Sequence, residues 1–595
     1  MNTLWNACAF GNYARCKRLA NESTIRECSA VDGSTPLYVA ASEGYDDICR
    51  LLLDLGATHA PRTDGRTPLH AAAFGGHAST CTLLLDRGAT HCTDRNGSTP
   101  LSLAAGKGHD DVCAVLLDRG ATHEGGAGGG CTPLSLAAWN GRATTCALLL
   151  RHGAPHVALR GGNTPLHCAA EAGSVELCEV LLDGGATHAP NHNGVTPLYF
   201  AAACNPQPAV CKLLLQRGAS QIATKQGHTP LTAAAENGYM ETCAVLLESG
   251  ATHDPDLNGW TPLMFAARNG HIAVCSLLLR HAATHDAAKN GATPLSLAAE
   301  NGHADVCETL LKHGATHACF SDGITPLFLA AENGHADVCS LLLRHGATHA
   351  GCEDGTTPLI IASTKGHLQV CEVLLKHGAT HAAAHEDNVT PLYVAALNGH
   401  LAVCILLLDH GADHTPITCS EDDKALNGAS PLCGATWEGH KDVCSLLLDR
   451  GASHAQTDDG STPLFLAAML GRANICALLL YHGAKQVGRR DGLTPAAIAA
   501  KNGHGDVVSL LMERAGGGAA PPSFVCPLTL SLMHDPVVGV DGHSMERWAA
   551  EKYVVEAKRD PITRTPCSPS SLRPNLALRD AIHAWLESRT ATEER

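Results

Sequence analysis

Residues 293–324 read TPLSLAAENGHADVCETLLKHGATHACFSDGI, and this unit decides the fold because it recurs along most of the chain. Thr293 can cap the free backbone N–H groups at a helix start, and Pro294 fits the first helical turn, where no N–H is needed. Gly302 ends this helix, and a second helix follows with Val, Cys and Leu at one-face spacing. Gly-Ala then ends the second helix, before residues that favour turns. Each unit therefore predicts a helix, a turn, a second helix and a hairpin loop.

Fifteen successive units begin with Thr-Pro-Leu or a close variant of it. The first residue of this tripeptide lies at positions 35, 67, 99, 132, 164, 196, 229, 261, 293, 325, 357, 390, 430, 462 and 494. Residues 4–20 look like a half-repeat without the tripeptide, and the last unit also departs from the pattern, as the caps of a solenoid do. One interval of 40 residues contains residues 415–427, including Glu421-Asp422-Asp423, which we expect to form a mobile acidic loop between two units.

The composition fits short, closely packed helices, because 45% of the 595 residues are hydrophobic and only 4% are aromatic. The formal net charge of −16 argues against nucleic-acid binding as the main function, since phosphate binding needs a basic surface. No apolar run approaches the ~18 residues of a membrane span, and residues 1–12 lack the features of a signal peptide. We therefore expect a cytoplasmic or nuclear protein that is not secreted and binds neither nucleic acid nor a membrane.

The 27 cysteines and 36 histidines raise the question of metal or redox chemistry. Fifteen cysteines, from Cys16 to Cys476, occupy one position of the predicted second helix. Neighbouring helices pack ~8–10 Å apart, too far for equivalent cysteines to share a zinc ion or a disulfide, so we interpret this position as a small buried apolar side chain. We interpret the Gly-His pairs as structural and the Gly-Ala-Thr-His series as a shared loop hydrogen bond. The sequence predicts no metal and no cofactor.

The repeated unit resembles the ankyrin repeat, whose pattern contains Gly-x-Thr-Pro-Leu-His, Ala-Ala, Gly-His, Leu-Leu and Gly-Ala. The resemblance covers about residues 1–515. It implies a mostly α fold, an ankyrin-repeat solenoid of about 15 repeats plus an N-terminal half-repeat. The units depart from the family in being usually one residue shorter, and His follows Thr-Pro-Leu only at His70 and His167.

Large apolar residues interrupt a mostly polar position at the ends of the first helices. These candidate anchors for a protein substrate are Phe74, Trp139, Leu397, Trp437 and Met469. Exposed aromatic side chains on such an array are plausible binding anchors, whereas single apolar side chains on a surface are also common, so both interpretations stay open.

A second domain is predicted after the repeats. Residues 516–522, GGGAAPP, read as a Gly/Ala/Pro linker, followed by a domain over 523–588 and a C-terminal tail over 589–595. The local pattern favours a strand over 537–540, a helix from Met545 to about Val555 capped by Ser544, and a last helix capped by Asn575. The segments FVCPLTLSLMHDPV (524–537) and PNLALRDAIHAWL (574–586) resemble the two ends of the U-box, a small α+β domain.

The related RING finger needs paired Cys or His ligands for two zinc ions, and this segment lacks such pairs. The resemblance to the U-box implies that hydrogen bonds and ion pairs replace the metals. The candidate residues for this structural polar network are Asp535, Glu546, Arg547, Asn575 and Arg579.

The U-box resemblance also implies a ubiquitin-protein ligase (E3) that recruits a ubiquitin-charged conjugating enzyme (E2). The E2-binding residues carried over by position are Leu528, Leu530, Tyr553, Pro561 and Arg564. Arg564 matches the basic residue that hydrogen-bonds across to the enzyme and ubiquitin. No residue is expected to carry ubiquitin covalently, since Cys526 lies in a structural Cys-Pro and Cys567 lacks a paired base.

These features together predict an E3 ligase whose array recruits an unknown protein substrate and whose U-box positions the E2 for direct transfer to a substrate lysine. The alternative is a non-enzymatic ankyrin scaffold with a degenerate U-box used only for docking or dimerisation. A homodimer through the U-box is compatible with either hypothesis. A third hypothesis, a metal or thiol buffer, predicts bound zinc in the purified protein.

Overall fold

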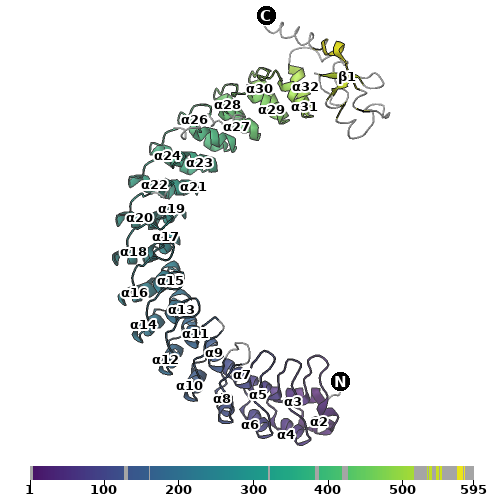
Figure 1. Cartoon of the computed structure of the whole chain (residues 1–595), viewed down its shortest axis with the longest axis vertical. Helices are drawn as coiled ribbons and strands as arrows, with labels where there is room; N and C mark the ends of the chain where they lie inside the picture. The colour runs from purple at the N-terminus through teal and green to yellow at the C-terminus, as the bar shows by residue number, and fades with distance from the viewer. Residues whose placement is uncertain are drawn as a thin grey trace. The chain divides into compact units, whose positions relative to one another are not determined.

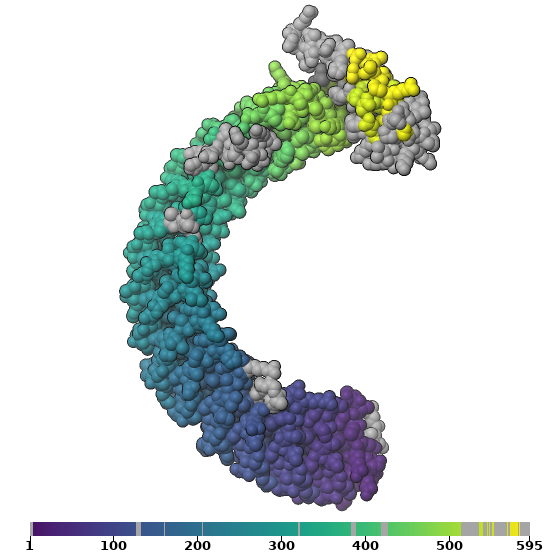
Figure 2. All heavy atoms as spheres, in the orientation of Figure 1, coloured from purple at the N-terminus to yellow at the C-terminus, as the bar shows by residue number. Residues whose placement is uncertain are grey.

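The computed structural model describes most of the repeats and part of the C-terminal domain. The described residues are 4–125, 132–159, 161–204, 206–318, 322–381, 388–417, 427–514, 533, 535–538, 544–547, 550–551, 568, 572–580 and 582. The chain divides into two compact units, the first of residues 1–294 and 312–315 and the second of residues 295–311 and 316–595. In each unit, odd-numbered helices form one row and even-numbered helices the other (Figure 1), and side chains close the gaps between successive repeats (Figure 2).

The odd-numbered helices are the first helices of the repeats. They are α1 Leu4–Ala9, α3 Pro36–Ser42, α5 Pro68–Gly75, α7 Pro100–Lys107, α9 Pro133–Trp139, α11 Pro165–Ala172, α13 Pro197–Cys204, α15 Pro230–Glu236, α17 Pro262–Arg268, α19 Pro294–Glu300, α21 Pro326–Glu332, α23 Pro358–Lys365, α25 Pro391–Leu397, α27 Pro431–Glu438, α29 Pro463–Met469 and α31 Pro495–Lys501.

The even-numbered helices are the second helices, and a 3₁₀ turn, η1 Thr24–Arg26, follows the first of them. They are α2 Tyr13–Leu19, α4 Asp46–Asp54, α6 Ala78–Asp86, α8 Asp110–Asp118, α10 Ala143–Arg151, α12 Val175–Asp183, α14 Pro208–Gln216, α16 Met240–Glu248, α18 Ile272–Arg280, α20 Ala304–Lys312, α22 Ala336–Arg344, α24 Leu368–Lys376, α26 Leu401–Asp409, α28 Lys441–Asp449, α30 Ala473–Tyr481 and α32 Gly505–Arg514.

The helix boundaries follow the capping chemistry that the sequence predicts. In α21, the Thr325 side chain accepts a hydrogen bond from the Phe328 backbone N–H at 3.1 Å, and Pro326 occupies the first turn. The first helix α23 ends at Gly366, whose φ of 78° is a left-handed conformation that favours glycine. The predicted pair of short helices per repeat is confirmed. Among the described residues, no helix is long and apolar enough to cross a bilayer.

The cysteine column lies in the buried face of the second helices. Cys339 is buried beside Val338 and Leu342, and burial raises the pKa of the Cys339 thiol to about 12. The cysteines of this column that the structure describes are all buried, and none forms a disulfide with another described residue. The interpretation of this position as a small buried side chain is confirmed.

Both histidine series connect neighbouring repeats through backbone carbonyls. In the Gly-His series, His335 Nε2 donates to the Glu300 carbonyl of the preceding repeat at 3.1 Å. In the Gly-Ala-Thr-His series, His317 Nε2 donates to the carbonyl of His345 at 3.0 Å, just after the second helix of the next repeat. The structural interpretation of both series is confirmed, and the loop hydrogen bond proves to join two repeats.

The hairpin loops of neighbouring repeats are also joined by hydrogen bonds, here between backbone groups. The Glu353 backbone N–H donates to the Asp322 carbonyl at 3.0 Å, so one hairpin tip continues into the next. The two ends of the long interval lie close together, because the Ile417 backbone N–H donates to the Ala429 carbonyl at 3.0 Å. Residues 418–426, the main part of the predicted acidic loop, lie outside the described residues.

The described part of the C-terminal domain contains an antiparallel sheet of order β2-β1-β3, with β1 Pro536–Val538, β2 Ser544–Glu546 and β3 Arg573–Pro574. The predicted helix start at Met545, with Ser544 as its cap, is wrong. Met545 is fully buried opposite Val537 in the sheet, so strand pairing overrides the local capping signal. A helical turn does follow Asn575, over residues 576–580, as predicted.

Candidate functional site

An ion pair joins the chain before β1 to the end of β2. Arg547 Nε donates to Asp535 Oδ2 at 2.6 Å, and the Arg547 backbone N–H donates to the Asp535 carbonyl at 3.0 Å. This hydrogen bond to the Asp535 carboxylate raises the pKa of Arg547. Both side chains are partly exposed, so burial does not fix their positions. The side-chain contact and the backbone hydrogen bond together hold Arg547 against Asp535.

Four hydrogen bonds of Asn575 to described residues join the strands to the last helical turn, and three of them use its backbone N–H or its side chain. Its backbone N–H donates to the Pro536 carbonyl at 2.7 Å, and its Nδ2 donates to Ser544 Oγ at 2.9 Å. Its Oδ1 accepts from the Leu578 backbone N–H at 3.1 Å, which caps the helical turn. Asn575 therefore connects β1, β2 and the turn, with Ser544 as a partner that sequence reasoning had assigned to a helix cap.

Of the other two candidates for the polar network, Arg579 contacts Asn575 through its backbone, and Glu546 is described only in its backbone. The Arg579 guanidinium lies 3.6 Å from the Asp580 carboxylate on the surface, while its backbone N–H donates to the Asn575 carbonyl at 3.0 Å. The side chain of Glu546 lies outside the described residues, although its backbone belongs to β2.

The candidate E2-binding residues lie outside the described residues. They are Leu528, Leu530, Tyr553, Pro561 and Arg564. In the chain, residues 528 and 530 precede β1, and residues 561 and 564 lie between β2 and β3. Asp535 follows Leu530 by five residues and Asn575 follows Arg564 by eleven residues, so their contacts hold the chain beyond each predicted segment.

The five candidate substrate anchors fall into two groups. In the first unit, Phe74 is the last but one residue of α5 and Trp139 is the last residue of α9, with 44% and 58% of their surface exposed. Lys107 already covers the Phe74 ring, with its Nζ 4.5 Å from the ring centroid. These two aromatic side chains are thus separate features of the first unit.

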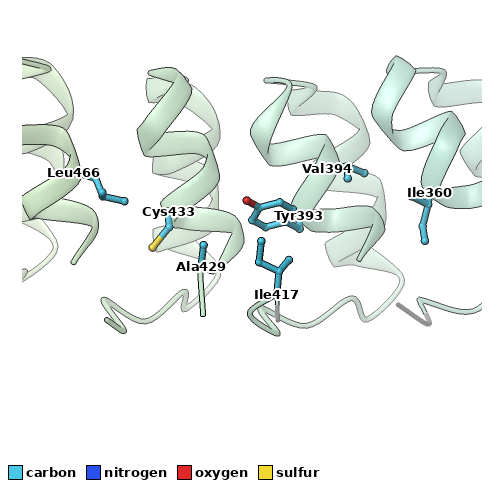
Figure 3. Packing of buried hydrophobic residues seen from close by; sticks show 7 residues of the cluster. All are labelled: Ile360, Tyr393, Val394, Ile417, Ala429, Cys433 and Leu466. Atoms are coloured by element: carbon cyan, nitrogen blue, oxygen red, sulfur yellow. The ribbon is translucent and has the colours of Figure 1, made fainter. Parts of the chain in front are cut away.

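In the second unit, Leu397, Trp437 and Met469 end the successive first helices α25, α27 and α29. All three are half-buried and pack against one hydrophobic cluster. Its buried members are Ile360, Tyr393, Val394, Ile417, Ala429, Cys433 and Leu466 (Figure 3). Ile417, at the base of the long interval, points toward Tyr393 from below the helices (Figure 3).

No metal site is evident in the described part of the chain, where His, Cys, Asp and Glu side chains do not gather in threes around a point. Burial in the repeats raises the pKa of the cysteine thiols, for example to about 12 at Cys275 and Cys404, which disfavours the thiolate that metal binding needs.

Comparisons with known proteins agree with this division of the chain. The family model described as the U-box domain matches residues 520–591. The family model described as ankyrin repeats in three copies matches overlapping segments at residues 1–63, 56–125, 88–160, 122–190, 184–256, 250–319, 313–385, 380–458 and 432–519.

Several known proteins share a segment of U-box size with this chain. WD repeat, SAM and U-box domain-containing protein 1 of Gallus gallus is 42% identical over 71 residues, which are 12% of this chain and 15% of that protein. The Homo sapiens protein of the same name is 42% identical over 69 residues, 11% of this chain and 14% of that protein. E3 ubiquitin-protein ligase CHIP of Arabidopsis thaliana is 40% identical over 68 residues, 11% of this chain and 24% of that protein. The similarity thus spans a quarter or less of each relative.

Proposed function

This chain belongs to the ankyrin-repeat proteins and carries a U-box domain at its C-terminal end, and from this premise we propose that it is an E3 ubiquitin-protein ligase. The ankyrin array recruits a protein substrate, and the U-box recruits a ubiquitin-charged E2. The observation that carries the proposal is the U-box match over residues 520–591, within which Leu528, Pro561 and Arg564 keep the residue types of the family's E2 contacts.

The proposed mechanism is positioning, with no covalent ubiquitin intermediate on this chain. The E2 thioester is attacked by a substrate lysine that the array holds nearby, so the ligase supplies proximity and orientation. The Asp535–Arg547 pair and the hydrogen bonds of Asn575 support this role, because they fix chain positions that follow each predicted E2-binding segment in the sequence. Such a ligase works where E2 enzymes are found, in the cytoplasm or the nucleus.

Autoubiquitylation of the full chain tests the proposal. With activating enzyme, a panel of E2 enzymes, ubiquitin and ATP, the chain should modify itself, and a zinc-selective chelator should not stop it. Leu528→Ala should weaken E2 binding by roughly tenfold, since it removes ~1–2 kcal/mol of apolar contact. Arg564→Ala should slow ubiquitin discharge more than it weakens E2 binding, because its role is orientation.

Leu576→Ala is the matched control, since Leu576 lies in the same domain with 53% of its surface exposed and outside the predicted E2 contacts. Its activity should equal that of the unchanged chain. If Leu576→Ala and Leu528→Ala lose equal activity, the assignment of Leu528 is wrong. If the folded chain activates no E2 of the panel, the scaffold hypothesis replaces the ligase.

A further inference from the structure

One position of the repeat forms a continuous row along the first helices. We define the helix-end column as the residues that lie seven positions after the first residue of each Thr-Pro-Leu motif, at the last or last but one position of the first helix. In the second unit the helix-end column consists of Glu300, Glu332, Thr364, Leu397, Trp437, Met469 and Lys501.

The backbone of the helix-end column is held by the next repeat at each step. Histidine Nε2 atoms donate to the carbonyls of Glu300, Glu332, Thr364, Leu397 and Met469 over distances of 2.9–3.2 Å. Where histidine is replaced by Arg472, its Nη2 donates to the Trp437 carbonyl at 2.9 Å instead. The backbone of the helix-end column is therefore ordered before a ligand binds, so ligand binding does not carry the entropic cost of ordering it. This ordered row of residues is called the platform below.

One end of the platform is acidic. Glu300 is exposed and Glu332 is half-buried, and neither carboxylate forms an ion pair with a described residue. The hairpin loops that precede α21 and α23, at the opposite end of these helices, carry the exposed carboxylates of Asp322, Glu353 and Asp354. Hydrogen bonds from Cys352 and from the Thr356 backbone lower the pKa of Asp354, so this carboxyl is charged at neutral pH.

The other end of the platform is apolar over three successive repeats. Leu397, Trp437 and Met469 rest on the buried cluster around Tyr393 and Leu466, which limits their motion (Figure 3 shows the cluster). Rigid, half-buried aromatic and aliphatic side chains of this kind are typical binding anchors.

We propose that the helix-end column of the second unit is the substrate-docking surface of the ligase, an inference that rests on the proposed function. Its ligand is an extended protein segment with Lys or Arg at one end, facing Glu300 and Glu332, and apolar residues at the other. Neighbouring helices pack ~8–10 Å apart, while an extended chain rises ~3.3 Å per residue. The ligand should therefore present one anchoring side chain about every third residue.

The corresponding column of the first unit differs in spacing, because a small residue separates its two aromatic residues and another separates its two glutamates. Its members are Ser42, Phe74, Gly106, Trp139, Glu171, Ala203, Glu236 and Arg268. Gly106 lies between Phe74 and Trp139, and Lys107 covers the Phe74 ring. The first unit therefore provides an internal control for the proposed docking surface.

Synthetic peptides test the proposal by fluorescence anisotropy with the full chain. The probe is a fluorescein-labelled peptide of about 16 residues, with two Lys about three residues apart near one end, three Leu about three residues apart near the other, and Ser and Gly elsewhere. Both chain directions are synthesised, because the column fixes the order of charged and apolar residues but not the direction. The control peptide has the same composition and the same five positions with Lys and Leu alternating.

The segregated peptide should bind in at least one direction, and at least about tenfold more tightly than the alternating peptide. Trp437→Ala should weaken binding by about tenfold or more, and the double variant Glu300→Gln, Glu332→Gln should weaken it and reduce its salt dependence. Trp139→Ala should leave binding unchanged. Glu300 is exposed and Glu332 is half-buried, and glutamine keeps the size of each side chain, so the test stands even if Trp437→Ala impairs folding.

Three results would overturn the proposal. They are absence of binding, equal binding of the alternating peptide, and self-association of the chain that Trp437→Ala abolishes, since the last would make a second copy the occupant. Discharge of a charged E2 to free lysine is measured in parallel. Discharge without peptide binding refutes the docking surface and leaves the proposed function intact, whereas peptide binding without discharge refutes the ligase and leaves the surface intact.

Discussion

The ankyrin array and the U-box satisfy polar groups in opposite ways. In the array, one hydrogen bond is repeated, as when His367 donates to the Glu332 carbonyl at 2.9 Å and His400 donates to the Thr364 carbonyl at 3.0 Å. In the U-box, Asn575 alone joins two strands and a helical turn. The array thus distributes its stability over many equivalent contacts, whereas the described part of the U-box contains a residue, Asn575, that joins several elements by itself. A change in the array should have local effects, and a change at Asn575 should affect the whole domain.

The largest expected effect tests whether damage in the array stays local. Leu407 is fully buried in α26, and Leu407→Ala should cost about 3 kcal/mol through lost contacts and a cavity. Hydrogen exchange should show lost protection in the repeats next to α26 and unchanged protection in distant repeats. Ile405→Ala is the control, since Ile405 lies in the same helix with 37% of its surface exposed and should have little effect. Loss of protection along the entire array would contradict the distributed picture.

The next effect tests the concentrated stability of the U-box. Asn575→Ala removes a helix cap and the bond to Ser544, which should cost about 2 kcal/mol, a large fraction of the stability of so small a domain. Hydrogen exchange in β1 and β2 should rise together. The control is Asn333→Ala in the array, because the Asn333 side chain makes one bond, to the Leu329 carbonyl at 2.9 Å. Equal destabilisation of both regions would refute the contrast between them.

A double-mutant cycle tests the contact between repeats. The backbone of Gly399 has a φ of 77°, and a Cβ there would lie 2.5 Å from the His440 ring of the next repeat. Gly399→Ala should cost about 1–2 kcal/mol, and part of this cost should disappear when His440 is also changed to Ala, because the steric conflict is then gone. If the costs of the two single variants in unfolding free energy, measured with urea, add up to that of the double variant, the cost of Gly399→Ala comes from the φ angle alone.

The smallest effect concerns pH. Burial lowers the pKa of His70 and of His167, whose Nδ1 atoms accept hydrogen bonds from the Thr67 and Thr164 backbone. Because the pKa is lower in the folded than in the unfolded state, their contribution is fully present above pH ~6.5 and is lost as the pH falls below this value toward the folded pKa.

Serine is the matched replacement, since Ser102 accepts the same bond from the Thr99 backbone at 2.9 Å in a neighbouring repeat. The double variant His70→Ser, His167→Ser should therefore lose less stability between pH ~7.5 and ~5.5 than the unchanged chain, by about 1 kcal/mol or less per histidine. An equal loss in both proteins would show that other groups dominate the acid response.

Local sequence rules predicted the helix boundaries of the repeats, because each boundary depends on capping contacts within one repeat. Thr325 caps α21 through bonds to its own helix, so spacing and residue type predict the boundary. They failed at Ser544, where Ser before Met-Glu-Arg looks like a helix start but pairing with β1 makes a strand. Sequence analysis also singled out Leu397, Trp437 and Met469 without their common support, because the contact of Ile417 with this cluster depends on tertiary packing across the long interval.

The most direct test of the central claim is single-turnover discharge of a charged E2 by the full chain. The account predicts that the chain accelerates transfer of ubiquitin to free lysine with at least one E2, and that Arg564→Ala and Asn575→Ala lower this rate while Leu407→Ala does not. The first variant removes an orienting contact and the second loosens the domain that presents it, whereas the third damages only the array. The account is contradicted if the folded chain accelerates ubiquitin discharge from no E2. It is also contradicted if Leu407→Ala lowers the discharge rate while Arg564→Ala and Asn575→Ala leave it unchanged.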